Sequence, residues 1–314
     1  MSPEFQIHRV DLPATAVGQR LDQALAAALP QYSRARLQRW IREGAVRLHG
    51  SPVRARDRVR GGEQLEVQAQ FATDDSVHPE SLPLQIVHED EALLVLNKPP
   101  GLVVHPGAGN RSHTLQNALL AHDAALARVP RAGLVHRLDK QTSGLLIVAR
   151  TPEAHIRLVA ALAARDITRE YLALVWGRPL AGGHIDEPIG RDRHVRTRMS
   201  VTHSGRAAVT HYRIEARFAV QTLLRVRLET GRTHQIRVHL AHIGFPVVGD
   251  PVYGARRRHL VAGPLQRLLS GFQRQALHAT RLVLAHPMTQ QPLSFEAPVP
   301  ADFAALLAAA REAT

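Results

Sequence analysis

Residues 134–150 read LVHRLDKQTSGLLIVAR. A histidine, an arginine, an aspartate and a lysine lie within positions 136–140, and the apolar run LLIVA follows at 145–149. A short apolar run directly after a Ser-Gly pair predicts a tight turn that leads into a buried strand. Such a turn would expose Asp139, the one carboxylate of the stretch, among basic neighbours that favour its ionised form.

Helical and strand-like patterns alternate irregularly on both sides of this stretch. The order is neither a repeated strand-helix unit nor a succession of strands alone, so the sequence predicts an α+β fold. We expect a mixed, mostly antiparallel β-sheet flanked by helices over residues 86–314. The expected strands are 92–97, 145–149, 169–177 and 222–230, and the expected helices are 114–121, 152–166, 234–243 and 301–313.

The N-terminal part of the chain predicts a separate, small α/β domain over residues 1–75. Leucines at four-residue spacing predict a helix that ends at Pro30, and a second helix is expected from Ser33, its N-cap, to Gly44. The polar, proline-containing stretch after this domain predicts a linker at 76–85. Short strands are expected within 45–53 and 63–68.

The chain carries 40 Lys and Arg against 27 Asp and Glu, a net charge of +13. This excess is concentrated, because ten arginines and only three acidic residues lie between Arg20 and Arg60. Such a charge favours a polyanionic partner, and nucleic acid fits better than an anionic membrane because no strongly amphipathic terminal helix is present. The side chains that we expect to contact RNA are Arg34, Arg36, Arg39, Arg42, Arg54, Arg56 and Arg58.

The composition also excludes several classes of protein. The chain has no cysteine, which excludes disulfides, a thiol nucleophile and cysteine-bound zinc. No apolar run is long enough to span a bilayer, and the first residues lack the apolar segment of a secretory signal. We therefore predict a cytoplasmic protein without a membrane partner, and a monomer as the default state.

The residues around Asp139 leave several kinds of chemistry open. A carboxylate between strands commonly caps a turn or pairs with a neighbour such as Arg137, whereas an ionised carboxylate in a cleft acts as a nucleophile or a base. The segment DKQT faintly resembles the aspartyl-phosphate motif of ion pumps, but the transmembrane segments or further aspartates of such enzymes are missing, as is a P-loop. A metal site at His234, His239 and His242 is disfavoured, because their spacing is not HExxH and 19 histidines make chance clusters common.

Four long stretches, in order, resemble the motifs of a known family. LVHRLDKQTSGLLIVAR is similar to the central motif of the RluA-type family of RNA pseudouridine synthases. NKPPGLVVHPG (97–107), ITREYLALVWG (167–177) and LETGRTHQIRVHLAHIGFPVVGDPVYG (228–254) are similar to its first motif, its tyrosine strand and its longest motif, and RQALHA (274–279) also fits. The N-terminal helices and strands resemble the RNA-binding domain named after ribosomal protein S-four.

The resemblance implies an enzyme that isomerises uridine to pseudouridine within RNA, a reaction without a redox or hydrolytic step and therefore without a cofactor or a metal. The target base would be flipped out of its stack. Asp139 would be the catalytic carboxylate, by attack on the anomeric carbon or by assisting a glycal intermediate, and Arg237 would pair with it. Tyr171 would stack on the flipped uracil and move a proton. The other substrate-binding residues that the resemblance implies are His136, Arg137 and Leu277.

The same resemblance implies large-subunit (23S) ribosomal RNA as the partner, with uridines of the helix 69 stem-loop as the targets. The alternative is a non-catalytic RNA-binding or ribosome-assembly protein with the same fold. Such a protein would keep the basic N-terminal domain but lose the carboxylate, so Asp139 within its complete motif favours the enzyme.

Overall fold

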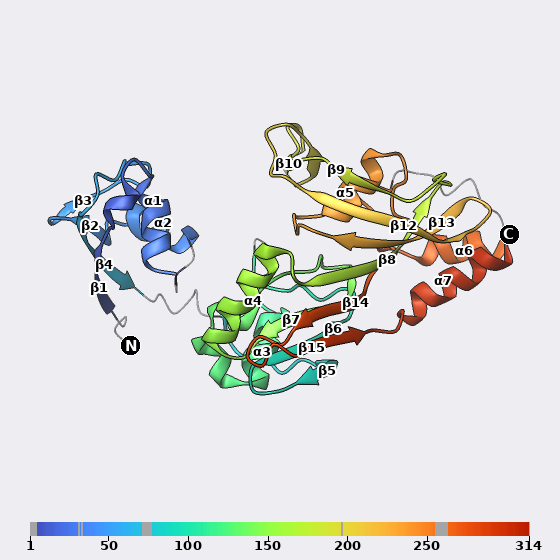
Figure 1. The fold of residues 1–314 in the computed structure, drawn as a ribbon, viewed down its shortest axis with the longest axis horizontal. Helices are drawn as coiled ribbons and strands as arrows, with labels where there is room; N and C mark the ends of the chain where they lie inside the picture. Colours follow the sequence, from blue (N-terminus) through green and yellow to red (C-terminus); the bar gives the residue numbers. More distant parts are fainter. Residues whose placement is uncertain are drawn as a thin grey trace. The chain divides into compact units, whose positions relative to one another are not determined.

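The computed structural model describes residues 5–30, 32, 34–70, 77–107, 109–195, 197–254 and 263–313. The chain divides into two compact units, Met1–His78 and Pro79–Thr314, both drawn in Figure 1. The predicted end of the first domain at residue 75 and the predicted start of the linker at residue 76 lie outside the described residues. The rest of the predicted linker, 77–85, forms neither helix nor strand.

The N-terminal unit combines two helices with a four-stranded antiparallel sheet. Its elements are β1 (Phe5–Asp11), the 3-10 helix η1 (Ala14–Ala16), α1 (Leu21–Ala28), α2 (Arg34–Arg42), β2 (Val46–Leu48), β3 (Ser51–Pro52) and β4 (Gln64–Gln70). The strand order is β1-β4-β2-β3. Leu25 of α1 and Leu37 and Trp40 of α2 are buried against Val46 and Val67 of the sheet, so this unit has a hydrophobic core of its own. Both predicted helices are present, and Ser33 lies outside the described residues.

An ion pair of the buried Asp22 links the two helices of this unit. Asp22 of α1 is fully buried; Arg34 Nη2 donates to its Oδ2 at 2.6 Å and Arg20 Nε donates to its Oδ1 at 2.9 Å. Burial alone would raise the pKa of Asp22, but the hydrogen bonds from Arg20, Arg34 and Gln38 outweigh it and lower that pKa to about 2. Arg34, which we predicted to contact RNA, therefore already neutralises a carboxylate of the core.

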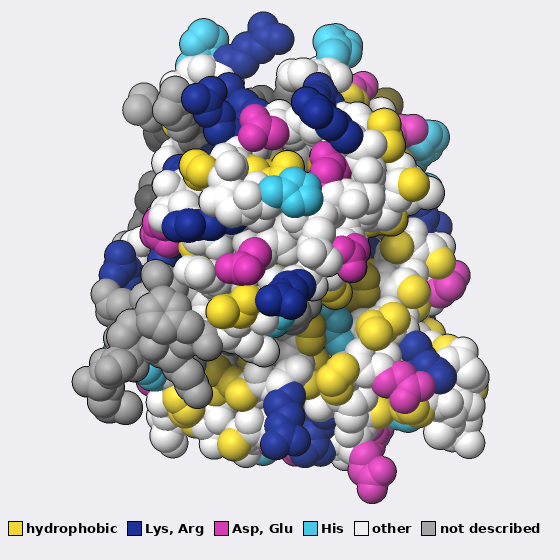
Figure 2. All heavy atoms as spheres, turned by 90° about the vertical axis from the view of Figure 1, so that its left-hand side faces the viewer, with side chains coloured by type: hydrophobic (Ala, Val, Ile, Leu, Met, Phe, Trp, Pro, Cys, Tyr) yellow, Lys and Arg dark blue, Asp and Glu magenta, His cyan; other side chains and the backbone are white. Residues whose placement is uncertain are grey.

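The other arginines predicted to contact RNA differ in their exposure. Arg36 is partly buried, and the exposed Arg58 donates from Nη1 to Gly18 O at 2.7 Å. Figure 2 shows one face of the molecule, on which basic side chains are spread among acidic ones and do not form one patch. The exposed members of the predicted set are Arg34, Arg39, Arg42, Arg54, Arg56 and Arg58.

The second unit is built on a nine-stranded sheet. Its strands are β5 (Ile86–Glu89), β6 (Leu93–Lys98), β7 (Ser143–Ala149), β8 (Thr168–Trp176), β9 (Gly183–Asp186), β12 (Val209–Arg217), β13 (Gln221–Leu228), β14 (Leu277–Ala285) and β15 (Pro292–Glu296). The order is β5-β6-β7-β14-β8-β13-β12-β9, with β15 paired to β14 (Figure 1). Among the described strands only β7 and β14 pair in parallel, so the predicted α+β fold with a mixed, mostly antiparallel sheet is confirmed.

Helices and a small second ribbon complete this unit. The helices are α3 (Leu115–His122), η2 (Ala124–Arg128), η3 (Pro130–Gly133), α4 (Pro152–Ala164), α5 (Gln235–His242), α6 (Gly263–Gly271) and α7 (Ala301–Glu312), and β10 (Ile189–Arg191) pairs with β11 (Met199–Val201). All eight elements predicted for this unit are present, with ends shifted by no more than two residues. Within the described ranges, no helix combines the length and the apolar character needed to cross a membrane.

Strand β7, which follows the loop with Asp139, is buried on both faces. Leu146 packs into the main core, whereas its neighbour Ile147 packs into a second cluster that includes Leu158 of α4. Burial on both faces explains why the apolar run is continuous instead of alternating. At the start of β7, Gly144 has φ +113°, and a Cβ there would lie 2.2 Å from Ala279 O of β14. Only glycine allows this approach, which brings the loop before β7 against β14.

Candidate active site

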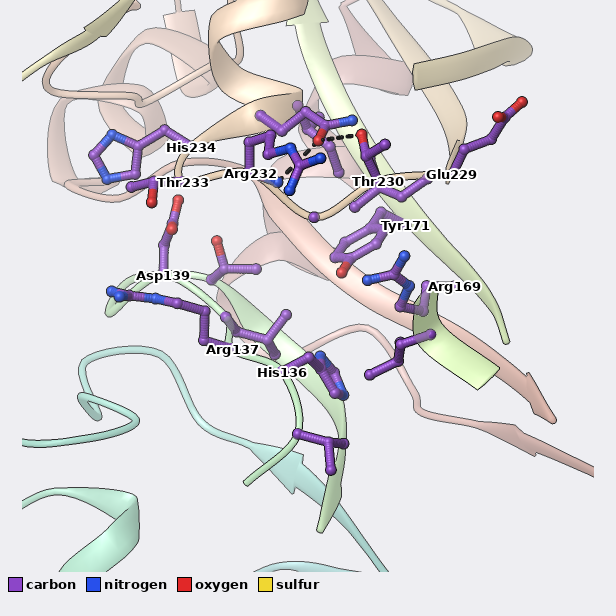
Figure 3. A pocket seen from close by; sticks show the side chains of 18 of the residues that line it. His136, Arg137, Asp139, Arg169, Tyr171, Glu229, Thr230, Arg232, Thr233 and His234 are labelled. Atoms are coloured by element: carbon purple, nitrogen blue, oxygen red, sulfur yellow. Dashed lines mark hydrogen bonds between the residues drawn. The ribbon is translucent and has the colours of Figure 1, made fainter. Parts of the chain in front are cut away.

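A cavity of about 600 Å³ opens in the second unit, and Figure 3 shows its lining. Three segments that are far apart in the sequence supply its walls: the loop before β7, strand β8, and the loop between β13 and α5. The sheet order places β14 between β7 and β8, so Leu277 at the start of β14 also lines the cavity. The structure thereby brings six predicted residues together: His136, Arg137, Asp139, Tyr171, Arg237 and Leu277.

Asp139 lies at the wall of the cavity and is held by an arginine. Arg237 Nη1 donates to Asp139 Oδ2 at 2.9 Å, which is the pairing implied by the sequence motifs. The same guanidinium donates from Nε and Nη2 to the two oxygens of Asp250, at 2.7 and 2.9 Å. The side chain of Asp250 is fully buried, that of Arg237 is 5% exposed and that of Asp139 is 17% exposed. Arg237 is therefore a rigid bridge between a buried carboxylate and a carboxylate that reaches the cavity.

The bridge is fixed on both of its sides. Val252 and Tyr253 donate their backbone N–H groups to Asp250 Oδ1, at 2.8 and 3.0 Å, and the Arg237 guanidinium lies over the Tyr253 ring at 5.1 Å. Burial alone would lower the pKa of Arg237, but the hydrogen bond and charge of Asp250 and the charge of Asp139 outweigh it and raise that pKa above its ordinary value of 12.5. A permanent positive charge therefore faces Asp139.

Helix α5 presents Arg237 from a loop that a glutamine holds in place. Gln235 Oε1 accepts from Thr230 Oγ1 at 2.7 Å and from the backbone N–H of Arg232 at 2.9 Å, bonds drawn dashed in Figure 3. Its Nε2 donates to Val209 O and to Thr210 Oγ1, both at 3.0 Å. One buried amide thus ties the loop after β13 to strand β12. This fixes the start of helix α5, which carries Arg237.

Tyr171 projects from β8 into the cavity, as Figure 3 shows. The side chain is 5% exposed. Burial raises the pKa of the Tyr171 phenol, and the charge of Asp139 adds to this effect while the charge of Arg169 opposes it. The phenol is therefore protonated at neutral pH and presents a hydroxyl and a ring face to the cavity.

His136 helps to build the cavity wall. Its Nε2 accepts a hydrogen bond of 3.0 Å from the backbone N–H of Ile147, so the proton of the neutral ring is on Nδ1. Burial, with the nearby charge of Arg169, lowers the pKa of His136 from 6.5 to about 3. His136 is thus a neutral residue that anchors the loop before β7 to the strand itself.

A pH dependence of stability follows from His136. Because its pKa is lowered in the folded state, the stability that it supplies is complete above pH 6.5 and is lost between pH 6.5 and about 3. The slope for one proton is at most about 1.4 kcal/mol per pH unit. His136→Gln keeps an acceptor for Ile147 but cannot titrate, so we expect a shallower loss of the free energy of unfolding in this pH range. Denaturant titrations at several pH values check this, and identical slopes for both proteins would contradict it.

Arg137 and Leu277 occupy different parts of the cavity. Arg137 is exposed, and its Nη1 lies 3.4 Å from His105 Nε2, a weak contact that leaves the guanidinium at the opening. Leu277 is 3% exposed and forms part of the apolar wall. Arg137 thus contributes a positive charge at the opening, and Leu277 contributes apolar surface to the wall.

Two of the three histidines weighed as metal ligands, His234 and His239, have other partners. His234 Nδ1 lies 2.9 Å from Tyr253 Oη. Both ring nitrogens of His239 are engaged, one with Thr210 Oγ1 and one with Glu187 O, each at 2.9 Å. Across the part of the chain that the structure describes, no group of three or more His, Asp or Glu side chains is arranged to hold a metal ion.

Several residues of the site were not predicted as functional. Asp250 lies in the quoted stretch 228–254, but nothing in its spacing indicates that Arg237 bridges it to Asp139 across 98 and 13 residues of sequence. Arg169 lies two residues before Tyr171 on β8, and the strand period of two indicates that both face the same side. Nothing in the sequence indicated a role for Gln235 in the site.

Comparison with known proteins identifies the family. A family profile described as "RNA pseudouridylate synthase" matches residues 92–242, and one described as "S4 domain" matches residues 19–65. The chain is 51% identical over 312 residues to "Ribosomal large subunit pseudouridine synthase D" of Xanthomonas campestris pv. campestris, which covers 98% of this chain and 94% of the relative. The chain belongs to the RNA pseudouridine synthase family.

Further relatives agree with this membership of the pseudouridine synthase family. A protein of Escherichia coli (strain K12) with the same name is 50% identical over 307 residues, and the alignment covers 95% of this chain and 94% of that protein. The solved structure of "Human RNA Pseudouridylate Synthase Domain Containing 4" superposes with a TM-score of 0.57 at 26% identity, over 72% of this chain and 93% of its own. The resemblance predicted from the motifs is confirmed, and the protein is an enzyme of the isomerase class.

Proposed function

We propose that this enzyme converts uridines of large-subunit ribosomal RNA to pseudouridine, in the helix 69 stem-loop, with Asp139 as the catalytic carboxylate. The observation that carries the proposal is the pairing of Asp139 with Arg237 in a cavity that Tyr171 also lines. The relatives named for the large ribosomal subunit support the substrate class. The net charge of +13 suits a partner that is a polyanion.

The geometry suggests how the residues act on a flipped uridine. The uracil would stack on the Tyr171 ring, with its ribose toward Asp139. Arg237 would hold Asp139 ionised and oriented, so that the carboxylate attacks C1′ or removes a proton from C2′ to give a glycal. The C1′–N1 bond breaks, the uracil turns, and C5 bonds to C1′. On the first route the Asp139–C1′ bond breaks in this step, and on the second C2′ takes back its proton from Asp139. The C5 proton then leaves and N1 takes up a proton, so nothing is oxidised, reduced or hydrolysed and no cofactor is needed.

We assign the remaining residues by their positions. Arg137 at the opening would fill the gap left in the RNA by the flipped nucleotide, and Leu277 would form an apolar wall for the uracil. His136 would support the loop that carries Asp139. We further propose a cytoplasmic monomer whose exposed N-terminal arginines contact phosphates of the RNA.

The test of this function is a map of pseudouridines in ribosomal RNA from cells with and without the gene. We expect modifications in helix 69 that disappear without the protein and return with the wild-type gene. Restoration by an Asp139→Asn gene would instead favour the non-catalytic alternative, in which the protein serves as an assembly factor.

We expect Tyr171→Phe and Tyr171→Leu to differ. Stacking on an aromatic ring is worth about 1–3 kcal/mol per base, so the Phe variant should bind the flipped base while the Leu variant binds it more weakly. If the hydroxyl moves a proton, the Phe variant should turn over at least about a hundredfold more slowly than wild type. RNA affinity and single-turnover rates check both effects. Full activity of the Phe variant would rule out the proton role, and equal affinities would rule out the stacking role.

We expect the N-terminal unit to supply affinity and not chemistry. Each unit has its own hydrophobic core, so residues 79–314 should fold without the N-terminal unit. The truncated enzyme should bind structured ribosomal RNA more weakly and with a flatter dependence on salt, because phosphate contacts release counterions. It should keep slow activity on short hairpins at high enzyme concentration. An unchanged rate and salt slope on intact ribosomal particles would contradict this role.

A further inference from the structure

One arginine in the interior of the cavity has no partner in the described structure. Arg169 is 7% exposed, and its Nε makes no hydrogen bond. The guanidinium forms no ion pair or hydrogen bond with any described residue. The other equally buried arginines of the described chain are neutralised, Arg237 by two carboxylates and Arg274 by Asp302 at 2.6 Å. A buried cation without a partner is costly, so its retention points to a role in the bound state.

The position of Arg169 favours the flipped base of the RNA as its partner over the phosphates of the RNA backbone. Arg169 and Tyr171 lie two residues apart on β8, and Figure 3 shows the guanidinium beside the Tyr171 ring. Arg137 and Arg165 are exposed at the rim, where the phosphates of a folded RNA can reach them. Only the nucleotide that is flipped into the cavity reaches the depth of Tyr171.

We propose that Arg169 stabilises the uracil anion that forms when the C1′–N1 bond breaks. The electron pair of this bond stays on the ring and spreads over N1, O2 and O4. Both routes left open for Asp139 generate this charge, so the proposal rests on the proposed function but not on the choice of route. A preorganised donor aimed at developing charge in a water-poor site is a strong catalytic device. When C5 bonds to C1′, the pair returns to the sugar and the anion is consumed.

Neighbouring groups leave the Arg169 charge available. His136, whose pKa the Arg169 charge helps to lower, is neutral and adds no competing charge. Glu229 also lines the cavity, but it is bound by Arg165 and His211. A transient anion on the uracil is therefore the negative charge that Arg169 is placed to receive.

The test combines a neutral variant with two substrates. Arg169→Gln should slow single-turnover pseudouridine formation by about 100-fold to 1,000-fold, with little change in RNA affinity. A fluorine at C5 of uridine withdraws electrons and stabilises the uracil anion by itself. The same variant should therefore slow the consumption of 5-fluorouridine RNA by a clearly smaller factor. Arg169→Lys, which keeps the charge with fewer donors, should lie between wild type and the Gln variant on uridine RNA.

Stability separates this role from a structural one. Removing an unpaired buried charge should leave the thermal midpoint of Arg169→Gln equal to or above that of wild type, whereas the matched variant Arg274→Gln should lower it because Asp302 loses its partner. A normal rate of Arg169→Gln, or equal slowing on both substrates, would overturn the proposal. If Arg169→Gln does not fold, the ratio of the two substrates for Arg169→Lys decides in the same way. An active Asp139→Asn enzyme would refute the catalytic role of Asp139. The comparison of uridine RNA with 5-fluorouridine RNA in the Arg169 variants would still test the role of Arg169.

Discussion

Asp139→Asn should abolish pseudouridine formation, with a loss of at least about a thousandfold in the single-turnover rate. The amide has the shape of the carboxylate but is neither a nucleophile nor a base. Arg237 keeps its two bonds to Asp250 in this variant, so the cavity should stay folded. RNA affinity should remain within about threefold of wild type, because phosphate contacts, which dominate affinity, are untouched.

The matched control is Asp166→Asn, which changes an exposed aspartate in the same way. This variant should keep the wild-type rate. Rates are measured with excess enzyme on a radiolabelled or mass-resolved RNA, so that product release does not hide the chemical step. A rate for Asp139→Asn within tenfold of wild type would remove Asp139 from the chemistry and would also weaken the role proposed for Arg237.

Arg237→Gln should reduce both stability and activity. The substitution leaves Asp250 buried with its two backbone N–H donors but without a counter-charge, and breaking a buried pair of this kind costs about 3–5 kcal/mol. Asp139 also loses the guanidinium that orients it, so the rate should fall at least about a hundredfold. Denaturant unfolding and single-turnover assays on the same preparation measure the two losses.

The double variant Arg237→Gln with Asp250→Asn separates these effects. It removes the buried charge together with its partner, so most of the stability should return. The activity should stay low, because Asp139 still lacks its guanidinium. Recovery of the wild-type rate in the double variant would mean that Arg237 only balances Asp250 and has no role at Asp139.

Local chemistry made several of the long elements predictable. The continuous run of β7 is buried on both faces, and the alternating or leucine-spaced patterns of β8, α4 and α7 indicate their secondary structure without any partner. The nine-residue strands β12 and β14 were not predicted, and neither were several shorter strands. β10 and β11 have three residues each, and the exposed and half-buried positions of β15 leave too weak a pattern, because pairing to a neighbour and not local preference makes them strands.

The sequence by itself determined the mixed fold, the basic N-terminal helices and the motif that exposes Asp139. These features rest on properties that neighbouring residues express locally: period, turn chemistry and charge. It also led, through the motifs, to Arg237 and Tyr171. The bridge to Asp250 and the unpaired charge of Arg169 were decided only by the tertiary structure. Whether a buried charge has a partner depends on which strands become neighbours. The sheet places β14 between β7 and β8, although β14 begins more than a hundred residues after β8 along the chain.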